Sequence, residues 1–327
     1  MIPLKPVLEL HLEEGTGINL RAASLLSTFP EYSPSRAKRD LRHPLGTYNS
    51  SIARISDKLK NCAANYESHF RHLTNLESDR AGTKSQAAFL DYLELSLYAA
   101  AEHVDDVESI LDSFFPSKLE FNRSKIVRKF KKDHKGIRDK ITSYANAIKH
   151  AQSRIRVFSA EFDHDGRTQL FHGIFFEGYS GGALGPSTVL HQGDRRVFSF
   201  NSLLWEIVAF VTGTSELLSD AIAALTDCAD AEVKHSGVFR EAVIAIARLP
   251  IYAFDESHLF ERISVRLHTG DLERCGLRSD IYGSLWPRWS KSENGQFLGD
   301  QNGYVADGVT RSFSIVSPKA LRLQHWS

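Results

Sequence analysis

Two side chains that could take part in chemistry, Asn146 and His150, stand one helical turn apart near the end of a predicted amphipathic helix. With Ile148 taken as the core direction and 100° of rotation per residue, both project to the opposite side of that helix. Three further polar residues fall near the same stripe: Asp139, Ser143 and Arg154. A polar stripe on the back of a core helix faces either water or a partner, so this stripe is the first candidate site.

The run Asn146-Ala147-Ile148-Lys149-His150, on one long helix among several, resembles the signature region of HEPN-type domains. Members of that superfamily typically show an arginine, then a polar residue that is often asparagine, then three residues and a histidine. Asn146 and His150 match the polar residue and the histidine, whereas Ala145 occupies the position of the arginine. The resemblance covers five residues as a motif and about residues 46 to 230 as a helix pattern.

Active members of the superfamily are usually metal-independent ribonucleases that pair two copies of the motif across a dimer, often in bacterial toxin–antitoxin or antiphage systems. In such a site the arginine holds the scissile phosphate, and the histidine moves a proton to or from the ribose hydroxyl or the leaving oxygen. Ala145 can do neither, but Arg154, one turn beyond His150, could supply the cation, as could the less favourably placed Lys149. The resemblance thus implies catalytic roles for His150, Asn146 and Arg154, with no cofactor and no metal.

Three interpretations of this motif follow. The leading one is a HEPN-like protein that binds or cleaves RNA within a bacterial antiphage defence or toxin module, active as a homodimer or in a complex that joins two motifs. As an enzyme it would be an endoribonuclease. The second is a catalytically inactive HEPN-like interaction or regulatory subunit that holds another protein, which Ala145 favours. The third is an accidental match on an unrelated helical scaffold.

Opposite charges dominate two consecutive predicted helices. Seven acidic residues and no lysine or arginine lie between Lys84 and Lys118, while ten basic residues lie from Lys118 to Lys140. Mutual attraction between neighbouring helices and ordinary solvated faces would explain this pattern. The alternative is a stripe that follows a nucleic-acid backbone and releases its counterions, although no aromatic residue is clearly interleaved to stack bases. The candidate RNA contacts are Arg128, Lys132, Lys135, Arg138 and Lys149.

Other patterns predict no further site. Cys62, Cys228 and Cys275 are far apart and indicate reduced thiols. The segment 163–166 (Asp-His-Asp-Gly) starts like a calcium loop but fits a hairpin turn better, and the glycines of 178–185 lack the spacing of a phosphate loop and indicate a plain loop. The fourteen histidines show no paired-ligand spacing, so we predict no metal site.

Long amphipathic helices must position the candidate residues. Apolar residues that recur every three or four positions predict one helix over 52–76 and a second over 89–114, stopped by Pro116. A third, which carries the motif, begins after a cap at Asn122 and continues to about residue 153. A fourth, apolar on most faces, begins at Asn201 or Ser202 and reaches Leu225 as a buried central helix. A fifth is expected over about 231–249, before Pro250.

Alternating apolar residues predict strands between and after these helices. Segments 157–162 and 169–176 predict a hairpin, and segments 188–191 and 195–200 predict a second one. Short strands are also expected at 263–267 and 309–316. Aromatic residues of this last region either fill a small core or anchor a partner: Trp286, Trp289 and Trp326.

The predicted fold class is therefore α+β and predominantly α. We expect an irregular N-terminal arm at 1–45, a long-helix bundle at 46–250 with an antiparallel β-meander inserted at about 155–200, and a small β-rich C-terminal segment at 251–327.

Composition narrows the function classes. Forty basic and forty acidic residues give a formal net charge of zero, so any attraction to nucleic acid must be local. The first residues lack the apolar stretch of a secretory signal, and the most apolar run, residues 203–211, is too short to span a bilayer and contains Glu206. We therefore expect a cytoplasmic protein with no membrane role, whose candidate partners are RNA and a second protein chain.

Overall fold

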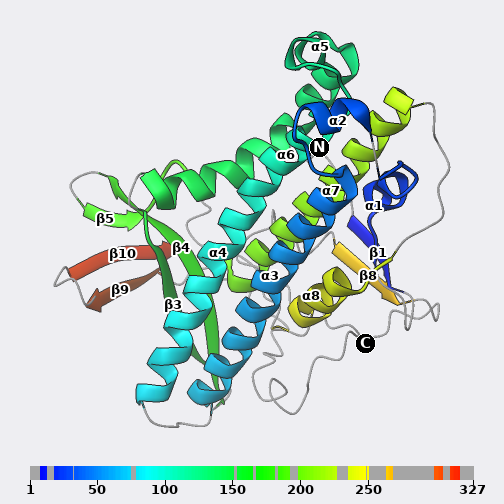
Figure 1. The fold of residues 1–327 in the computed structure, drawn as a ribbon. Coiled ribbons are helices and arrows are strands. Elements are labelled where there is room, and N and C mark those ends of the chain that lie inside the picture. Colours follow the sequence, from blue (N-terminus) through cyan, green and yellow to red (C-terminus); the bar gives the residue numbers. More distant parts are fainter. Residues whose placement is uncertain are drawn as a thin grey trace, which may run out of the picture.

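The chain is α+β and mainly α in a computed structural model (Figure 1). The structure describes residues 8–12, 18–31, 33–74, 79–150, 153–164, 167–180, 183–191, 198–226, 235–247, 249, 263–267, 298–304 and 310–316. This confirms the predicted fold class at the level of α+β, predominantly α.

Two long helices, α3 (Pro44–Thr74) and α4 (Asp79–Asp112), run side by side (Figure 1). Their facing sides are apolar, because buried residues recur every three or four positions on both helices. On α3 these include Tyr48, Ile52, Ile55, Leu59, Cys62 and Tyr66; on α4 they include Phe89, Leu93, Leu97, Ala100, Val104, Val107 and Leu111. Both helices begin earlier than the apolar series alone predicted.

The predicted third helix is two helices, α5 (Lys118–Arg123) and α6 (Lys125–His150). Ser117 and Glu120 form the start of α5, where the Ser117 hydroxyl accepts a hydrogen bond from the Glu120 backbone N–H at 3.3 Å. The Ser124 hydroxyl accepts from the backbone N–H of Val127 and so caps α6. The predicted cap at Asn122 is wrong, since this residue lies inside α5, and α6 ends at His150 rather than near residue 153.

Helix α7 (Phe200–Thr226) is the apolar central helix that the sequence predicts, and it contacts α1, α4, α6 and α8. It starts at Phe200, so both predicted caps, Asn201 and Ser202, lie inside the helix. Among the described residues its stretch Leu203–Thr226 alone is long and apolar enough to cross a membrane, and more than half of that stretch is buried inside the protein. A core helix meets the same test of length and composition. Helix α8 (Gly237–Ala247) is shorter than the predicted fifth helix.

The residues before α3 add short elements to the helical core. Helix α1 (Arg21–Leu26) packs against α7, and α2 (Pro34–Lys38) precedes the loop that leads into α3. Strand β1 (Leu8–Leu12) pairs in parallel with β8 (Ile263–Leu267). Strand β2 (Ile18–Asn19) pairs antiparallel with β7 (His235–Ser236). The predicted arm therefore pairs with strands from much later in the chain.

A small antiparallel sheet lies between α6 and α7 in the sequence. Strands β3 (Ile155–His164) and β4 (Arg167–Ser180) form the predicted first hairpin. The predicted second hairpin is wrong, because residues 188–190 form a turn and β4 instead pairs with β5 (Ala183–Pro186) and β6 (Phe198–Ser199). The predicted glycine loop is also wrong in part, since Gly178 and Gly185 face each other as paired strand residues.

Aromatic rings join three helices at the centre of the core. Tyr66 of α3 stacks on Phe200 of α7 with 3.9 Å between ring centroids, and Phe89 of α4 meets both rings edge-on. The sheet joins this core where Phe176 of β4 stacks on Tyr144 of α6 at 4.9 Å. These contacts fix the end of α6 that carries the candidate motif.

Strands β9 (Leu298–Tyr304) and β10 (Thr310–Val316) form an antiparallel hairpin, and β10 lies near β5. Strands β8 and β10 occupy the segments in which strands were predicted. The tryptophans Trp286, Trp289 and Trp326, together with Cys228 and Cys275, lie outside the described residues.

Candidate nucleic-acid interface

The predicted site residues of α6 lie on one exposed face of that helix. Asn146 and His150 are exposed and Ile148 is buried, as their spacing predicts. At 100° per residue, Arg128, Lys132 and Lys135 fall within about 60° of the same direction, and all three are exposed. From Arg128 to His150 this face is about 33 Å long, at 1.5 Å of rise per residue. We call it the α6 face.

The basic side chains of the α6 face are left available by their neighbours. The Arg128 guanidinium donates hydrogen bonds to the backbone carbonyls of Arg123 and Ser124. Lys132 and Lys135 make no ion pair with any of the residues that the structure describes, nor does Lys149, which lies beside the face. These three exposed cations are available to solvent or to an external anion.

Three acidic residues of α4 have partners outside α6. Glu102 and Asp106 pair with Arg54 of α3 at 3.2 and 2.7 Å. Asp112 pairs with Arg39 and, at 3.6 Å, with Lys118. Mutual attraction between the two charged helices therefore explains little of the charge on α6.

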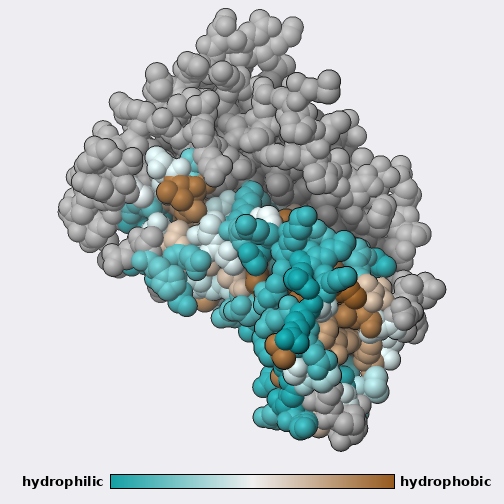
Figure 2. Space-filling view, turned by 90° about the horizontal axis from the view of Figure 1, so that it is seen from above, coloured by the Kyte–Doolittle hydropathy of each residue, from teal (hydrophilic) through white to brown (hydrophobic). Residues whose placement is uncertain are grey.

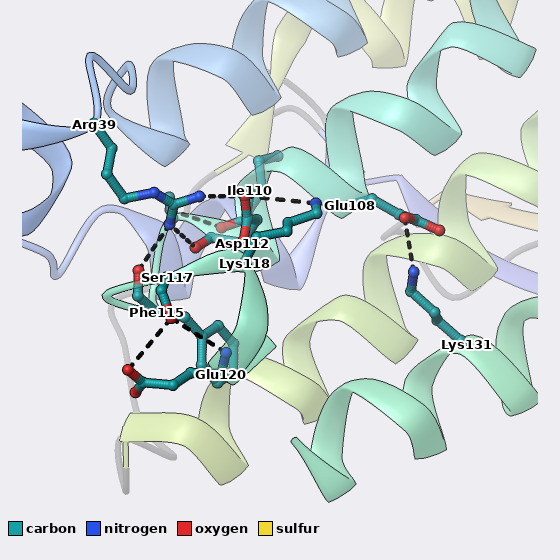
Figure 3. Close-up of polar contacts among 10 residues, drawn as sticks. Arg39, Glu108, Ile110, Asp112, Phe115, Ser117, Lys118, Glu120 and Lys131 are labelled. Carbon is teal, nitrogen blue, oxygen red and sulfur yellow. Dashed lines mark hydrogen bonds and ion pairs between the residues drawn. The ribbon is translucent and has the colours of Figure 1, made fainter. Parts of the chain in front are cut away.

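One ion pair does join α4 directly to α6. Glu108 and Lys131 meet at 2.8 Å (Figure 3), at the edge of the α6 face one turn before Lys135. Figure 3 also shows Arg39 and Lys118 gathered around Asp112 at the end of α4. Together these contacts hold the first half of α6 with its cationic face outward.

The middle of the α6 face carries a carboxylate. Arg138 donates two hydrogen bonds to Asp139, at 2.9 and 2.7 Å. The predicted RNA contact Arg138 is therefore largely engaged by its neighbour. The face divides into a cationic half around Arg128, Lys132 and Lys135 and a polar half with Asn146 and His150. Seen from the side on which α5 and α6 lie in Figure 1, most of the coloured surface is hydrophilic (Figure 2).

A buried carboxylate of α7 holds in place the half of the α6 face that carries Asn146 and His150. Glu206 of α7 is 5% exposed and accepts a hydrogen bond from the Tyr144 hydroxyl at 3.1 Å. Lys140 reaches the same carboxylate from α6 at 2.9 Å. These contacts fix the rotation of α6 about its axis, because Tyr144 must face α7. Asn146 is then turned outward.

Ala145, which occupies the arginine position of the resembled motif, is 5% exposed. It shares the buried side of α6 with Ile141 and Ile148 rather than the exposed side with His150. A cationic side chain at this position would either be buried away from water or have to extend past its neighbours to reach the solvent. The structure therefore separates position 145 from the α6 face.

Arg154 does not extend the α6 face, because the helix ends four residues earlier. Its backbone carbonyl accepts a hydrogen bond from the N–H of Glu177 in β4. Its charge acts on Glu94 of α4: burial raises the pKa of Glu94, and Arg154 opposes that shift. Arg154, the candidate catalytic cation, is thus close enough to α4 to influence Glu94.

A buried polar group inside the helical core was missed by the sequence reasoning. The imidazole Nδ1 of His103 lies 2.8 Å from the Ser51 hydroxyl, and His134 Nε2 lies 2.9 Å from the Thr214 hydroxyl. Burial lowers the pKa of His103 to about 3, with His134 and Arg54 adding to the shift. Burial also lowers the pKa of His134 to about 4. The one available signal was that His134 falls on the apolar series of its helix.

The side chains of the α6 face are better suited to binding an anion than to catalysis by a single copy of the chain. The α6 face offers lysines and an arginine for phosphates and an exposed imidazole for proton transfer. Within the described part of the chain, no cluster of three or more histidine, cysteine, aspartate or glutamate residues could hold a metal ion. The described residues thus form a mainly α, α+β protein with an exposed basic face on α6.

Comparison with protein-family models, with curated proteins and with solved structures found no match.

Proposed function

We propose that this protein binds RNA through the α6 face. The observation that carries the proposal is the exposure of Arg128, Lys132 and Lys135 on one side of α6, with no acidic partner for the two lysines in the described residues. Phosphates spaced along an RNA backbone are a suitable partner for such a row, because each contact releases condensed counterions. Asn146 and His150 continue the row and would meet the same strand.

The finer parts of the proposal come from the sequence pattern and from the resemblance. They are a HEPN-like helical bundle with an inserted β-meander and a separate β-rich C-terminal segment, a homodimer that joins two α6 faces, and a role in a bacterial defence or toxin module in the cytoplasm. Two copies would bring two His150 side chains to one RNA and compensate for a site that is incomplete in one chain.

Salt dependence of RNA binding tests the α6 face. In fluorescence anisotropy with a labelled RNA, Lys132→Gln/Lys135→Gln should bind more weakly than the parent. The slope of log K against log salt should fall by about 1.5, since each phosphate contact contributes roughly 0.7 to 0.9. The control Lys38→Gln/Lys60→Gln removes the same charge from exposed positions on α2 and α3 and should keep the parent slope. Equal slopes for both double variants would refute the proposed face.

RNA cleavage separates an enzyme from a binding subunit. In the presence of EDTA, metal-independent cleavage that is lost in His150→Ala would establish a ribonuclease, since general acid–base catalysis contributes about 10²- to 10⁴-fold. Loss in Arg154→Ala as well would assign the cation to Arg154. Unchanged cleavage by His150→Ala would exclude this site as its source.

The burial of Ala145 favours a second candidate, a HEPN-like subunit without catalysis. This candidate predicts RNA binding that depends on Lys132 and Lys135 but no cleavage by any form of the folded protein. Size-exclusion chromatography with light scattering would show whether two copies associate, which the catalytic form requires.

A further inference from the structure

A pocket of about 340 Å³ lies between the start of α3 and the end of α4, and the residues that line it include none of α6. The loop after α2 closes one side of it. Its polar lining residues recur every three or four positions on both helices, so each helix turns one side to the pocket. They are Thr47, Ser50, Ser51 and Arg54 on α3, and Asp106, Ser109 and Ser113 on α4.

The lining of the pocket includes a buried hydroxyl group. Ser51 is 1% exposed, and its hydroxyl lies 2.8 Å from His103 Nδ1. His103 is fully buried and its Nε2 has no hydrogen-bond partner among the described residues. A buried N–H without an acceptor is rarer than a buried acceptor without a donor, so the ring proton belongs on Nδ1 and is donated to Ser51. The Ser51 hydroxyl can then donate its own hydrogen to a ligand.

Two guanidinium groups line the walls. Arg54 is held by Asp106 at 2.7 Å and by Glu102 at 3.2 Å, which leaves further N–H donors of its fork unused. Arg42 is exposed, lines the pocket, and makes no ion pair within the described ranges. Guanidinium groups bind phosphate through paired, charge-assisted hydrogen bonds. The hydroxyls of Ser50 and Ser109 add further donors to the lining.

We propose that this pocket binds a phosphomonoester about the size of a nucleotide. A volume of about 340 Å³ exceeds that needed by phosphate alone and lies at the small end of ligand pockets. Two sources share this chemistry: a free nucleoside monophosphate and the 5′-phosphate end of an RNA. The proposal does not depend on the α6 face.

Carboxylates near the pocket oppose such a ligand. Asp106 shares the Arg54 guanidinium with Glu102, and Asp40 lines the pocket with no ion-pair partner in the part of the chain described. Asp40 adopts a positive φ of 53°, which asparagine tolerates as well as aspartate does. Asp40→Asn therefore removes the like charge without adding backbone strain, and it should strengthen binding.

Isothermal titration calorimetry with AMP, adenosine and inorganic phosphate tests the pocket. AMP should bind and adenosine should not. Arg42→Gln should weaken AMP binding about tenfold, as expected for the loss of one charge-assisted pair. The control Lys38→Gln makes the same charge change four residues away and should have no effect on AMP binding. Asp40→Asn should tighten AMP binding about twofold to fivefold. A 5′-phosphorylated oligonucleotide that binds more tightly than its 5′-hydroxyl form only when Arg42 is present would identify an RNA end as the source.

Two results would overturn the proposal. One is equal affinity for adenosine and AMP, which would show that the phosphate is not recognised. The other is no heat of binding for AMP at millimolar concentration with a folded parent protein. Failure of the Lys132→Gln/Lys135→Gln test would leave this pocket unaffected, because those lysines do not line it.

Discussion

At the scale of single residues, position 145 limits what the α6 face can do. Ala145 is buried beside Tyr144, whose ring stacks on Phe176 and whose hydroxyl meets Glu206. An arginine at this position would overfill a packed region and place a charge away from water. The side chain that the resembled motif requires is therefore not merely missing here, because the fold leaves little room for it.

We expect Ala145→Arg to lower the free energy of unfolding by about 2 kcal/mol or more. Ser143→Arg should cost less than about 0.5 kcal/mol, because Ser143 is half-buried at the edge of the α6 face and an arginine there can reach water. Urea unfolding followed by circular dichroism measures both values. Ser143→Arg should also tighten RNA binding. Equal stability of the two variants would contradict the burial argument.

The residue scale also shows which parts of the site were predictable. The exposure of Asn146 and His150 follows from their angle to Ile148, which depends only on helical geometry. The partners of charged residues do not follow from sequence spacing. Arg154 opposes the raised pKa of Glu94, and Arg39 forms an ion pair with Asp112, because the tertiary fold brings distant segments together.

At the scale of elements, the end of α4 depends on a residue from another segment. Arg39, in the loop after α2, donates to the backbone carbonyls of Asp112 and Phe115 at 3.0 and 2.8 Å (Figure 3). It also pairs with the Asp112 carboxylate at 2.6 Å. The last carbonyls of a helix lack partners within the helix, so one guanidinium satisfies several acceptors at once.

Arg39→Ala should lower the free energy of unfolding by roughly 2 to 4 kcal/mol, because it leaves the buried Asp112 carboxylate with Lys118 as its one remaining ion-pair partner among the described residues. Arg39→Lys should fall between Arg39→Ala and the parent, since an ammonium can pair with Asp112 but cannot span both carbonyls. Lys38→Ala, at the exposed neighbour, should change stability by less than about 0.5 kcal/mol. Urea denaturation would rank the three variants, and a loss below about 0.5 kcal/mol for Arg39→Ala would contradict this role.

The same dependence explains which elements were predictable. The long helices follow from apolar residues every three or four positions, a local property of the chain. Helix ends and strand partners do not. Ser124 rather than Asn122 caps α6. Strand β4 pairs with β5, which lies in a segment predicted as a loop, and with β6, which was predicted to pair with 188–191. Pairing of β1 with β8 joins residues more than 250 positions apart, which no local pattern specifies.

At the scale of the whole molecule, two neutral histidines lie in the helical core among α3, α4, α6 and α7. His103 and His134 both lie near Phe210, with ring centroids 6.0 and 5.9 Å away. The hydroxyls of Ser51 and Thr214 satisfy one nitrogen of each ring. Because four helices contribute to this group, protonation of either histidine would disturb their common packing rather than one local contact.

The protein should therefore lose stability as the pH falls below about 6.5. Burial lowers the folded-state pKa of His103 to about 3 and of His134 to about 4, whereas an unfolded histidine has a pKa near 6.5. Below pH 6.5 the unfolded chain binds more protons than the folded one, so each histidine removes about 1.4 kcal/mol per pH unit until the pH reaches its folded pKa. Urea unfolding at pH 7.5, 6.5, 5.5 and 5.0 measures this slope. The double variant His103→Gln/His134→Gln should be less stable than the parent at pH 7.5, but its stability should fall less steeply below pH 6.5. If the variant loses stability as steeply as the parent does, these histidines do not control the acid sensitivity of the fold.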